Sequence, residues 1–389
     1  MANINKYNVS KQNEAIELAR HDLIAFGKLF LPDDFMRSET PPFHYEIADT
    51  ITDPKKQQTA IILPRGHGKT VLTKCDIMQA FCFTKEPLFY GWVSATAKLA
   101  TGNMDYIKYH LEFNERIQYF FGNLKGNKWT ETDVETTNGC KLISKSNISG
   151  IRGGAKLHKR YDLIILDDFE DENNTITPEA RSKNSNLITA VVFPALEPGT
   201  GRLRINGTPV HYDSFINNLI VNYEKSVQKG NDFSWNVILK KAIMEDGTML
   251  WNSWFGKKEM ERKKKFYADS GQPHKFFQEY MMEVQSADDS IFTRDHIKYY
   301  DGHYMHEEES GISFLNIDGD VKPINVFVGV DPATDSIRRD ADFSVLIAIA
   351  VDADNNIYIL DYLRKRSIPV LGIPGEDKKG IVDYMFDYS

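Results

Sequence analysis

Short apolar runs alternate with amphipathic segments through the first half of the chain. Residues 12–30 place apolar side chains three and four positions apart, which predicts an N-terminal helix that ends before Pro32. The apolar runs TAIIL, LFYGWVS, YDLIILDD and RLRINGT follow, and helical patterns come after the first two. Strands that alternate with helices predict an α/β fold with a mostly parallel sheet, which binds ligands at the carboxyl ends of its strands.

This alternation is lost beyond residue 210. Residues 256–284 are rich in lysine and follow Trp235, Trp251 and Trp254; the lysines favour a solvated helix face over a surface that tracks DNA. Residues 286–323 are polar, acidic and irregular, which predicts a linker. Residues 324–363 hold three β-rich runs, the last two joined by DADNN, and these predict an antiparallel meander.

The run IILPRGHGKT contains a variant of the phosphate-binding loop. Gly68, Lys69 and Thr70 fit the pattern G-x-x-x-x-G-K-[ST], but Leu63 stands where the first glycine belongs. An isolated G-K-T is often a chance match, whereas this one follows a buried strand and opens a helix. Gly66 and Gly68 allow a tight turn. We therefore predict that the loop and Lys69 bind phosphates and that the Thr70 hydroxyl holds Mg²⁺.

The run YDLIILDDFEDENN lies about a hundred residues further on. A magnesium-binding carboxylate belongs at the end of a buried strand, and Asp167 directly follows the apolar residues 163–166. Asp168 is a candidate water-activating base, and Glu170 is a longer alternative. An acidic loop after a core strand is the structural alternative, but the separation from the phosphate loop suits a nucleotide site.

Three further features belong with this site. Arg65, inside the loop, is expected either to reach the transferred phosphate, as an arginine finger does, or to form an ion pair with Asp167 or Asp168 in the empty site. Residues 152–154 form a basic, glycine-containing loop before the acidic strand, and Thr208 follows another strand, where a hydroxyl could sense the γ-phosphate. An ordinary surface loop and an ordinary β-turn are the alternatives for the last two.

Composition and charge narrow the class of protein. The chain has 389 residues, 41% hydrophobic and 26% charged, so it can bury a large core. It shows no run of about 20 apolar residues, and we expect no membrane association. Its three cysteines suit a reducing compartment and structural roles. The formal charge of −8 is uneven: residues 286–389 hold 20 acidic and 10 basic side chains, against 35 and 37 before them. Clustered carboxylates also suit a metal-dependent nuclease.

Together the motifs resemble the large terminase subunit of tailed bacteriophages, the motor-nuclease that packages DNA. The resemblance rests on the arginine-led loop, the RG pair before LIILDD, the GTP segment at Gly207–Pro209 and GVDPA at Gly329–Ala333, in this order. It implies an α/β fold: a RecA-like P-loop ATPase of the ASCE type followed by an RNase H-like nuclease. The expected parts are a helical lead-in (1–40), the ATPase domain with a linker subdomain (41–285), a linker (286–323) and a partial nuclease domain (324–389).

The resemblance also implies roles for single residues. The nucleotide loop would comprise Arg65, Gly66, His67, Gly68, Lys69 and Thr70. Asp167 would be the Walker B carboxylate, and Thr208 would lie in the coupling motif. Many family members have a glutamate directly after the Walker B aspartate; this chain has Asp168 there, so either Asp168 or Glu170 would activate water. Phe43, His44 and Tyr45 occupy the region where the family contacts adenine, and they are either adenine contacts or packing residues.

The nuclease assignment depends on acids in the last segment. Two-metal cleavage needs several carboxylates that converge on a pair of ions. Asp331 ends a strand and resembles the family's first metal ligand, while Asp342 and Asp361 lie nearby in the meander; a surface turn is the alternative for all three. The other metal-binding acids of the family would follow residue 389. We therefore expect an incomplete nuclease that cleaves DNA weakly or not at all.

The resemblance further implies cofactors and partners. These are ATP with Mg²⁺, Mg²⁺ or Mn²⁺ at a completed nuclease site, double-stranded DNA, a portal protein, a small terminase subunit and a homo-oligomeric ring. The protein would act in the cytoplasm of an infected bacterium, at the procapsid portal, and would be absent from the mature virion. The competing interpretations are a helicase-like P-loop ATPase and a non-catalytic remnant or scaffold of a split terminase gene.

Overall fold

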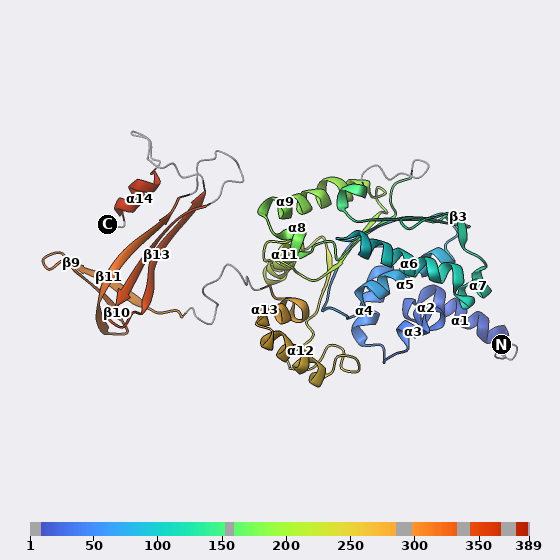
Figure 1. The fold of residues 1–389 in the computed structure, drawn as a ribbon, viewed down its shortest axis with the longest axis horizontal. Coiled ribbons are helices and arrows are strands. Elements are labelled where there is room, and N and C mark those ends of the chain that lie inside the picture. The colour runs from blue at the N-terminus through green and yellow to red at the C-terminus, as the bar shows by residue number, and fades with distance from the viewer. Residues whose placement is uncertain (1–8, 152–158, 285–297, 333–342, 367–378, 388–389) are drawn as a thin grey trace. The chain divides into compact units, whose positions relative to one another are not determined.

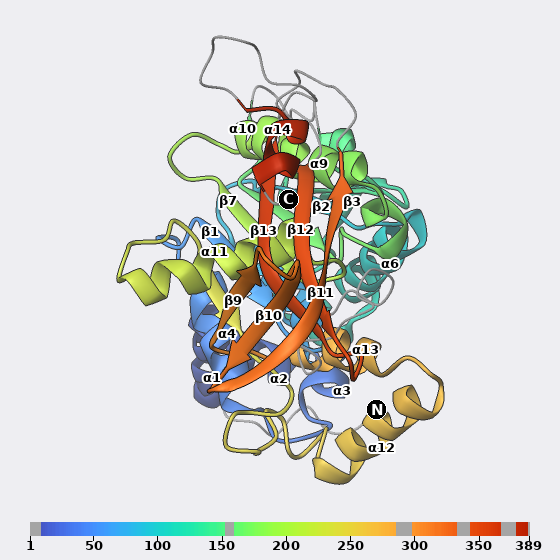
Figure 2. The same cartoon turned by 90° about the vertical axis from the view of Figure 1, so that its left-hand side faces the viewer.

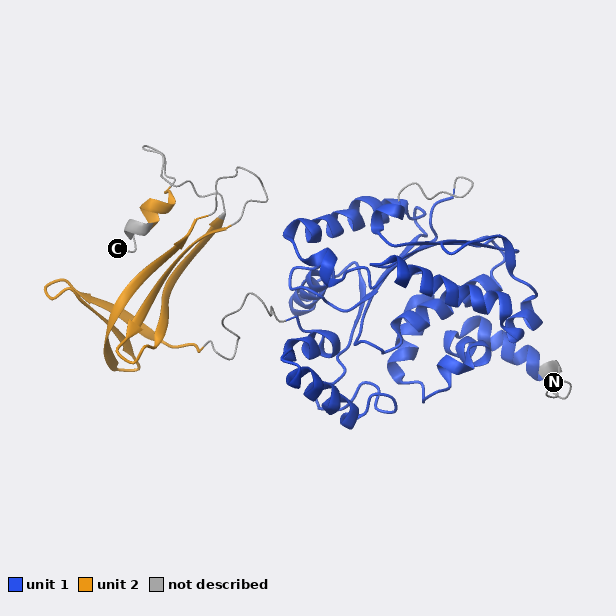
Figure 3. Cartoon of the chain, viewed as in Figure 1, with its two compact units in different colours: residues 1–290 blue, residues 291–389 orange. Residues whose placement is uncertain are grey.

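A computed structural model describes residues 9–151, 159–284, 298–332, 343–366 and 379–387. The chain forms two compact units, Met1–Ser290 and Ile291–Ser389 (Figure 3). No helix of the described residues is long and apolar enough to cross a bilayer.

The first unit is built on an eight-stranded sheet with the strand order β3-β4-β5-β2-β6-β7-β1-β8 (Figure 1). Strands β5, β2, β6, β7, β1 and β8 run parallel, and β3 and β4 add an antiparallel edge. The strands are β1 (Gln58–Ile62), β2 (Phe89–Val93), β3 (Lys125–Trp129), β4 (Asp133–Thr136), β5 (Lys141–Lys145), β6 (Leu163–Asp167), β7 (Arg202–Gly207) and β8 (Asn236–Leu239).

Helices cover both faces of this sheet. Because successive side chains of a strand point to opposite faces, each strand contributes to two core clusters. Ile61 of β1 faces one core cluster and Ala60 and Ile62 face the other. The first cluster is covered by helices from the N-terminal half, the second by helices that follow β6 (Figure 1). The first group comprises α1 (Val9–His21), α2 (Leu23–Phe30), α3 (Pro32–Phe35), α4 (Pro42–Thr52), α5 (Lys69–Phe83), α6 (Ala97–Phe113) and α7 (Glu115–Phe121). The second comprises α8 (Glu172–Thr175), α9 (Pro178–Leu187), the π-helix η2 (Ile188–Val192), α10 (Phe193–Ala195) and α11 (Phe215–Lys229), with the short 3₁₀-helix η1 (Ile148–Ile151) before β6.

The N-terminal helical segment differs from its prediction in two ways. The single helix expected over residues 12–30 is divided at Asp22, whose carboxylate caps α2 by accepting a hydrogen bond from the Ala25 amide at 2.9 Å. The segment also belongs to the main core, since Ala19, Phe26 and Phe30 are buried in the first cluster. The described residues up to 40 are therefore part of the ATPase-like unit and do not form a separate lead-in.

A small third cluster closes the first unit. Ala242, Met260, Phe276 and Tyr280 form its buried centre. It is built from α12 (Lys257–Asp269), α13 (Pro273–Phe276) and the π-helix η3 (Phe277–Met281). The segment predicted as a basic helix is α12, and its apolar side holds Met260 against the rest of this cluster.

The second unit is a five-stranded antiparallel sheet with the order β13-β12-β11-β10-β9 and one described helix, α14 (Ile381–Asp387) (Figures 1 and 2). The strands are β9 (Gly302–Glu307), β10 (Ile312–Ile317), β11 (Asp320–Asp331), β12 (Phe343–Asp352) and β13 (Ile357–Arg366). The meander predicted from residue 324 is confirmed, but the linker predicted over 286–323 is wrong where it is described, because β9, β10 and the start of β11 lie there. Most side chains of β9 are exposed, so the apolar signal of a strand is missing.

Candidate functional site

The phosphate loop connects β1 to α5, as its sequence predicts. Gly66 and Gly68 have φ values of +80° and +87°, a left-handed conformation that glycine adopts without steric cost, and Gly68 caps the amino end of α5. Leu63, at the position of the usual first glycine, is fully buried in the first core cluster. The loop therefore begins by continuing the buried strand, which gives a physical reason for an apolar residue there.

Lys69 lies inside the loop that it would serve. Its Nζ donates hydrogen bonds to the carbonyl oxygens of Leu63 at 2.6 Å and Pro64 at 3.3 Å. Burial lowers the pKa of this lysine, while the nearby carboxylates of Asp168 and Asp167 favour its charged form. A buried ammonium group that donates to carbonyl oxygens can instead donate to an anionic ligand such as a phosphate.

Asp167 and Thr70 come together at the carboxyl ends of β6 and β1. The Thr70 hydroxyl donates to both carboxylate oxygens of Asp167, at 3.0 and 3.2 Å, across 97 residues of sequence. Asn206 of β7 donates to the same carboxylate at 2.9 Å. Burial, with a contribution from the charge of Asp168, raises the pKa of Asp167 to about 6. A buried carboxylate beside a hydroxyl is the oxygen donor set that Mg²⁺ prefers.

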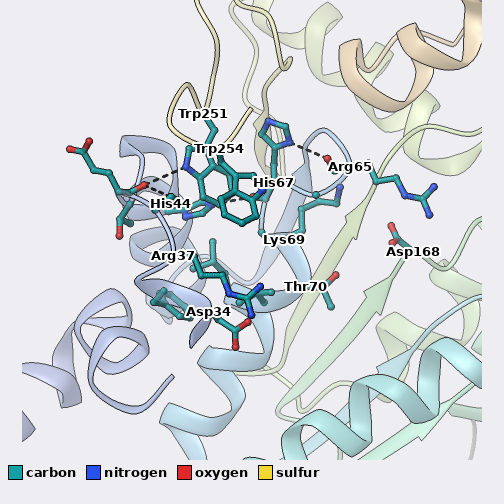
Figure 4. A pocket seen from close by; sticks show the side chains of 18 residues that line it. Asp34, Arg37, His44, Arg65, His67, Lys69, Thr70, Asp168, Trp251 and Trp254 are labelled. Atoms are coloured by element: carbon teal, nitrogen blue, oxygen red, sulfur yellow. Dashed lines mark hydrogen bonds between the residues drawn. The ribbon is translucent and has the colours of Figure 1, made fainter. Parts of the chain in front are cut away.

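Asp168 lines the same cleft but has a very different environment. Its φ of +43° is left-handed, and its amide donates to the Asn206 carbonyl at 3.0 Å. The side chain is exposed and lines one cleft together with Arg65, Lys69 and Thr70 (Figure 4). It is thus accessible to a water molecule next to a bound phosphate, as a proton acceptor must be.

Glu170 is not among the residues that line the cleft. Its side chain is 4% exposed, and its two carboxylate oxygens accept hydrogen bonds from the amides of Phe215 at 2.8 Å and Ile216 at 3.0 Å. These are the first two residues of α11, where a carboxylate also stabilises the helix dipole. Glu170 is therefore an anchor for α11, and the structure does not support the alternative that it activates water.

Arg65 forms a different ion pair from the one expected in the empty site. Its guanidinium pairs with Glu279 at 3.5 Å, and its amide donates to the Glu279 carbonyl at 3.0 Å. Among the described residues it forms its ion pair with this glutamate and not with Asp167 or Asp168. The arginine side chain is 74% exposed, so its pairing is weak and it remains free to turn toward a phosphate.

The segment predicted as a coupling motif follows β7, which lies between β6 and β1. Thr208 directly follows this strand and is half-buried, but it is not among the residues that line the cleft. Asn206, two positions earlier, contacts the site: it bonds Asp167 and, at 3.0 Å, the Thr73 hydroxyl of α5. The side-chain amide of Asn206, which the sequence analysis did not predict, therefore contacts the site where Thr208 was expected.

The cleft is about 310 Å³ in volume and extends beyond the phosphate loop. Its far end includes Arg37, Trp251 and Trp254, whereas Asp168 and Arg65 lie at the opposite end (Figure 4). Thr40 also lines the cleft. His44 also lines it, with Nε2 at 3.1 Å from the His67 carbonyl, and burial lowers the pKa of both histidines to about 4. Both rings are therefore neutral near pH 7.

Two of the three suggested adenine contacts do not reach this cleft. Phe43 is buried in the first core cluster. Tyr45 is 41% exposed and accepts a hydrogen bond from Lys28 at 3.3 Å. Neither lines the cleft, so packing and surface roles explain them, and His44 is the member of this group that remains at the site.

Among the described residues of the second unit, no group of three or more His, Cys, Asp or Glu side chains is arranged to hold a metal ion. Asp331 pairs with Val345 of β12, and Asp361 of β13 pairs with Ala348. A bulge lies between Ile359 and Asp361. Asp331 and Asp361 stay predicted nuclease ligands, and Asp342 and the loop at 152–154 lie outside the described residues.

Comparison with known proteins gives a structural relationship. No protein-family model matches the sequence, and no curated protein sequence matches it either. The large terminase of bacteriophage HK97 is similar in structure, with a TM-score of 0.50 and 14% identity, over 88% of this chain and 67% of that chain. The chain has the fold of a phage large terminase. The predicted fold class, an ATPase-like α/β unit followed by a nuclease-like sheet, is confirmed.

Two further terminase structures are similar over different parts of the chain. The ATPase domain of the Thermus phage P74-26 large terminase has a TM-score of 0.42 and 14% identity, covering 64% of this chain and 94% of that chain. The large terminase of another thermophilic bacteriophage, in complex with ADP, has a TM-score of 0.38 and 13% identity, covering 86% and 68%.

Four residues near the phosphate loop were not predicted from the sequence. Asn206, Thr40, Trp254 and Glu279 come from four segments that are distant in sequence and meet around the phosphate loop. The asparagine had a signal, since it is a polar residue at the end of a buried strand. The other three lie in irregular or amphipathic segments where no local pattern marks them.

Proposed function

We propose that the protein is a large terminase subunit, an ATP-driven motor that moves double-stranded DNA into a viral procapsid. The contact between Thr70 and Asp167 carries this proposal. It joins the helix after the phosphate loop to the end of a buried strand, and it forms the oxygen pair that would hold the magnesium ion of MgATP.

The residues around this pair fit that ion on the chemistry of their donors. The Asp167 carboxylate is buried, its pKa is raised, and its described hydrogen bonds come from neutral hydroxyl and amide groups. Binding of a divalent ion would therefore favour its charged form. When bound, Mg²⁺ would neutralise charge on the phosphate oxygens. Lys69 would leave the carbonyl oxygens of the loop and donate to the β- and γ-phosphates.

Hydrolysis then needs a proton acceptor and a stabilising cation. We assign Asp168 as the group that orients the attacking water and accepts its proton, because its exposed carboxylate faces the cleft. The water oxygen forms a bond to the γ-phosphorus while the bond to the β–γ bridging oxygen breaks, giving ADP and inorganic phosphate. Arg65, released from Glu279, or an arginine of a neighbouring subunit would stabilise the transferred phosphoryl group.

The wider setting rests on the likeness to terminases. It comprises double-stranded DNA as track, a portal protein, a small terminase subunit and a homo-oligomeric ring, in the cytoplasm of the infected bacterium and absent from the mature virion. For the second unit we propose weak or absent DNA cleavage.

The test is ATP hydrolysis with and without double-stranded DNA. We expect DNA to stimulate turnover and Lys69→Ala to lower kcat/KM by about 10²-fold or more, because it removes a charge aimed at the phosphates. Lys225→Ala, at an exposed lysine of α11, is the matched control and should leave the rate unchanged. Turnover that does not depend on Lys69 would contradict the motor and favour a scaffold. Stimulation by single-stranded DNA alone would favour the helicase-like alternative.

A further inference from the structure

Helix α12 concentrates positive charge in one part of the first unit (Figure 1). Its thirteen residues hold six basic and three acidic side chains, a net charge of +3. Residues 1–285 as a whole hold 37 basic and 35 acidic side chains, so the remainder of this part of the chain is close to neutral. A local excess of charge of this kind creates a positive potential that attracts an anionic partner.

Three of the basic side chains of α12 are used inside the molecule. Arg262 donates two hydrogen bonds to the carboxylate of Glu259, both at 2.8 Å. The ammonium group of Lys263 lies over the ring of Tyr280, 5.3 Å from its centre, and that of Lys264 lies 5.8 Å from the centre of another ring of η3. Ion pairing and packing against its own cluster therefore explain half of the basic sequence.

The other three basic side chains form what we call the outer face of α12: Lys257, Lys258 and Lys265. All three are exposed, and none of their ammonium groups forms an ion pair or a hydrogen bond with a described residue. Lys258 and Lys265 are seven residues apart, so they share one side of the helix and lie about 10 Å from each other along its axis. The buried Met260 is on the opposite side. The outer face thus carries three charges that nothing described neutralises.

The chemistry of the outer face favours nucleic acid over protein as its partner. Lysine is depleted in protein–protein interfaces, whose centres are apolar and aromatic, and Phe266 is the one exposed large apolar residue of α12, a helix that the structure describes in full. Lysines bind the phosphates of a nucleic-acid backbone and release counterions. Double-stranded DNA carries about one charge per 1.7 Å of its axis, so a face about 10 Å long spans several phosphates.

We propose that the outer face of α12 binds the phosphate backbone of double-stranded DNA through its three lysines. The sequence favoured a solvated helix face, and the structure separates the lysines that pack from those that remain free. The inference rests on the proposal that double-stranded DNA is the track of the motor. Since the contact is made by charge alone, it is independent of base sequence and weakens as salt is added.

The surroundings of α12 connect its outer face to the nucleotide site. Phe255, two residues before the helix, stacks on His67 of the phosphate loop, with centroids 4.6 Å apart and an interplanar angle of 12°. After the helix, Glu279 pairs with Arg65 of the same loop at 3.5 Å, and its carbonyl accepts a hydrogen bond from the Arg65 amide at 3.0 Å. DNA on the outer face thus contacts a cluster that touches the loop at two points.

Fluorescence anisotropy of a short labelled DNA duplex, with the full chain and without nucleotide, tests this inference over a range of salt concentrations. The test variant is Lys257→Gln/Lys258→Gln/Lys265→Gln. At about 0.1 M salt we expect its Kd for the duplex to rise by about tenfold or more. The slope of log Kd against log salt concentration should fall by about one for each lysine removed, because each neutralises one phosphate.

A matched control removes the same charge elsewhere on the first unit. Lys183→Gln/Lys225→Gln/Lys229→Gln changes three exposed lysines of α9 and α11 and should keep the wild-type Kd and salt slope. The melting temperatures of both triple variants should match the wild type, since all six side chains are exposed.

DNA-stimulated ATP hydrolysis gives a second measurement. In the test variant the DNA concentration that gives half-maximal stimulation should rise by about tenfold, in line with the loss of affinity. The Kd for a non-hydrolysable ATP analogue, measured without DNA, should not change, because the three lysines do not line the cleft.

The outcomes distinguish this inference from the proposed function. Wild-type DNA binding by the test variant would overturn the inference and favour an acidic protein as the partner of α12, and an equal loss in the control would also overturn it. A preference of the wild type for single-stranded DNA would overturn the duplex as partner. Turnover that does not depend on Lys69, with the expected DNA binding, would instead overturn the proposed function and leave the contact of α12 with DNA intact.

Discussion

Asp168 has a backbone conformation that restricts which side chain can stand there. Its φ of +43° is left-handed, a region in which Asp and Asn are several-fold enriched among residues other than glycine. The amide is fixed by the Asn206 carbonyl, so the conformation belongs to the junction between β6 and β7. This gives a physical reason for an aspartate at this position.

Asp168→Asn should remove the proton acceptor without disturbing this backbone. Asparagine also tolerates the left-handed region and has nearly the same shape. We expect kcat for ATP to fall by about 10²–10⁴-fold, with nucleotide affinity and thermal stability close to the wild type. Steady-state hydrolysis and calorimetric binding measure both quantities. A variant that hydrolyses ATP at the wild-type rate would show that another group accepts the proton.

At the scale of elements, α11 is joined to β6, the strand that ends in Asp167. Glu170, three residues after Asp167, holds the first two amides of α11. Gly207 contributes close packing, since a β-carbon there would lie 2.5 Å from the Ile216 side chain. The end of β6, the end of β7 and the start of α11 thus form one packed junction beside the cleft.

Glu170→Ala should destabilise this junction. It leaves two amides without an acceptor, so we expect the free energy of unfolding to fall by about 2–4 kcal/mol. Glu170→Gln keeps one carbonyl oxygen and should lose less. Glu172→Ala is the control, because this exposed residue forms a surface ion pair with Lys275 and should lose about 1 kcal/mol or less. Urea unfolding followed by tryptophan fluorescence gives these values. A fall in turnover of the folded Glu170→Gln protein as large as that of Asp168→Asn would restore Glu170 as the water-activating candidate.

At the scale of the whole molecule, the second unit carries the candidate metal ligands of the nuclease. Asp331 ends β11, and Asp361 lies next to a bulge in β13. Two-metal cleavage needs several carboxylates that converge on a pair of ions. Among the described residues no group of three or more His, Cys, Asp or Glu side chains is arranged to hold a metal ion.

We therefore expect the purified chain to nick supercoiled plasmid weakly or not at all in Mg²⁺ or Mn²⁺. Asp331→Ala and Asp361→Ala should both match the wild type, since neither acid belongs to a group of possible metal ligands among the described residues. Gel analysis of nicked and linear plasmid measures the rate. Robust metal-dependent nicking that Asp331→Ala abolishes would contradict this prediction.

The sequence predicted four of the eight strands of the first sheet, and β3, β4, β5 and β8 were not foreseen. The four strands of the alternating region, the helix that starts at Lys69 and the two glycines of the loop could be placed because their signals lie within a few residues. The errors also have local causes. Asp22 ends one helix and caps the next within a continuous apolar pattern, and β9 is too exposed to show a strand pattern.

By itself the sequence determined which residues could build a phosphate loop and an acidic strand end, because glycine conformation and hydrophobic periodicity act over short distances. The tertiary structure alone decided which side chains share the site. Strand order placed Asn206 between the loop and Asp167, and chain folding brought Thr40 and Trp254 into the same cleft. These outcomes depend on packing and register between distant segments, and no local pattern in the sequence encodes them.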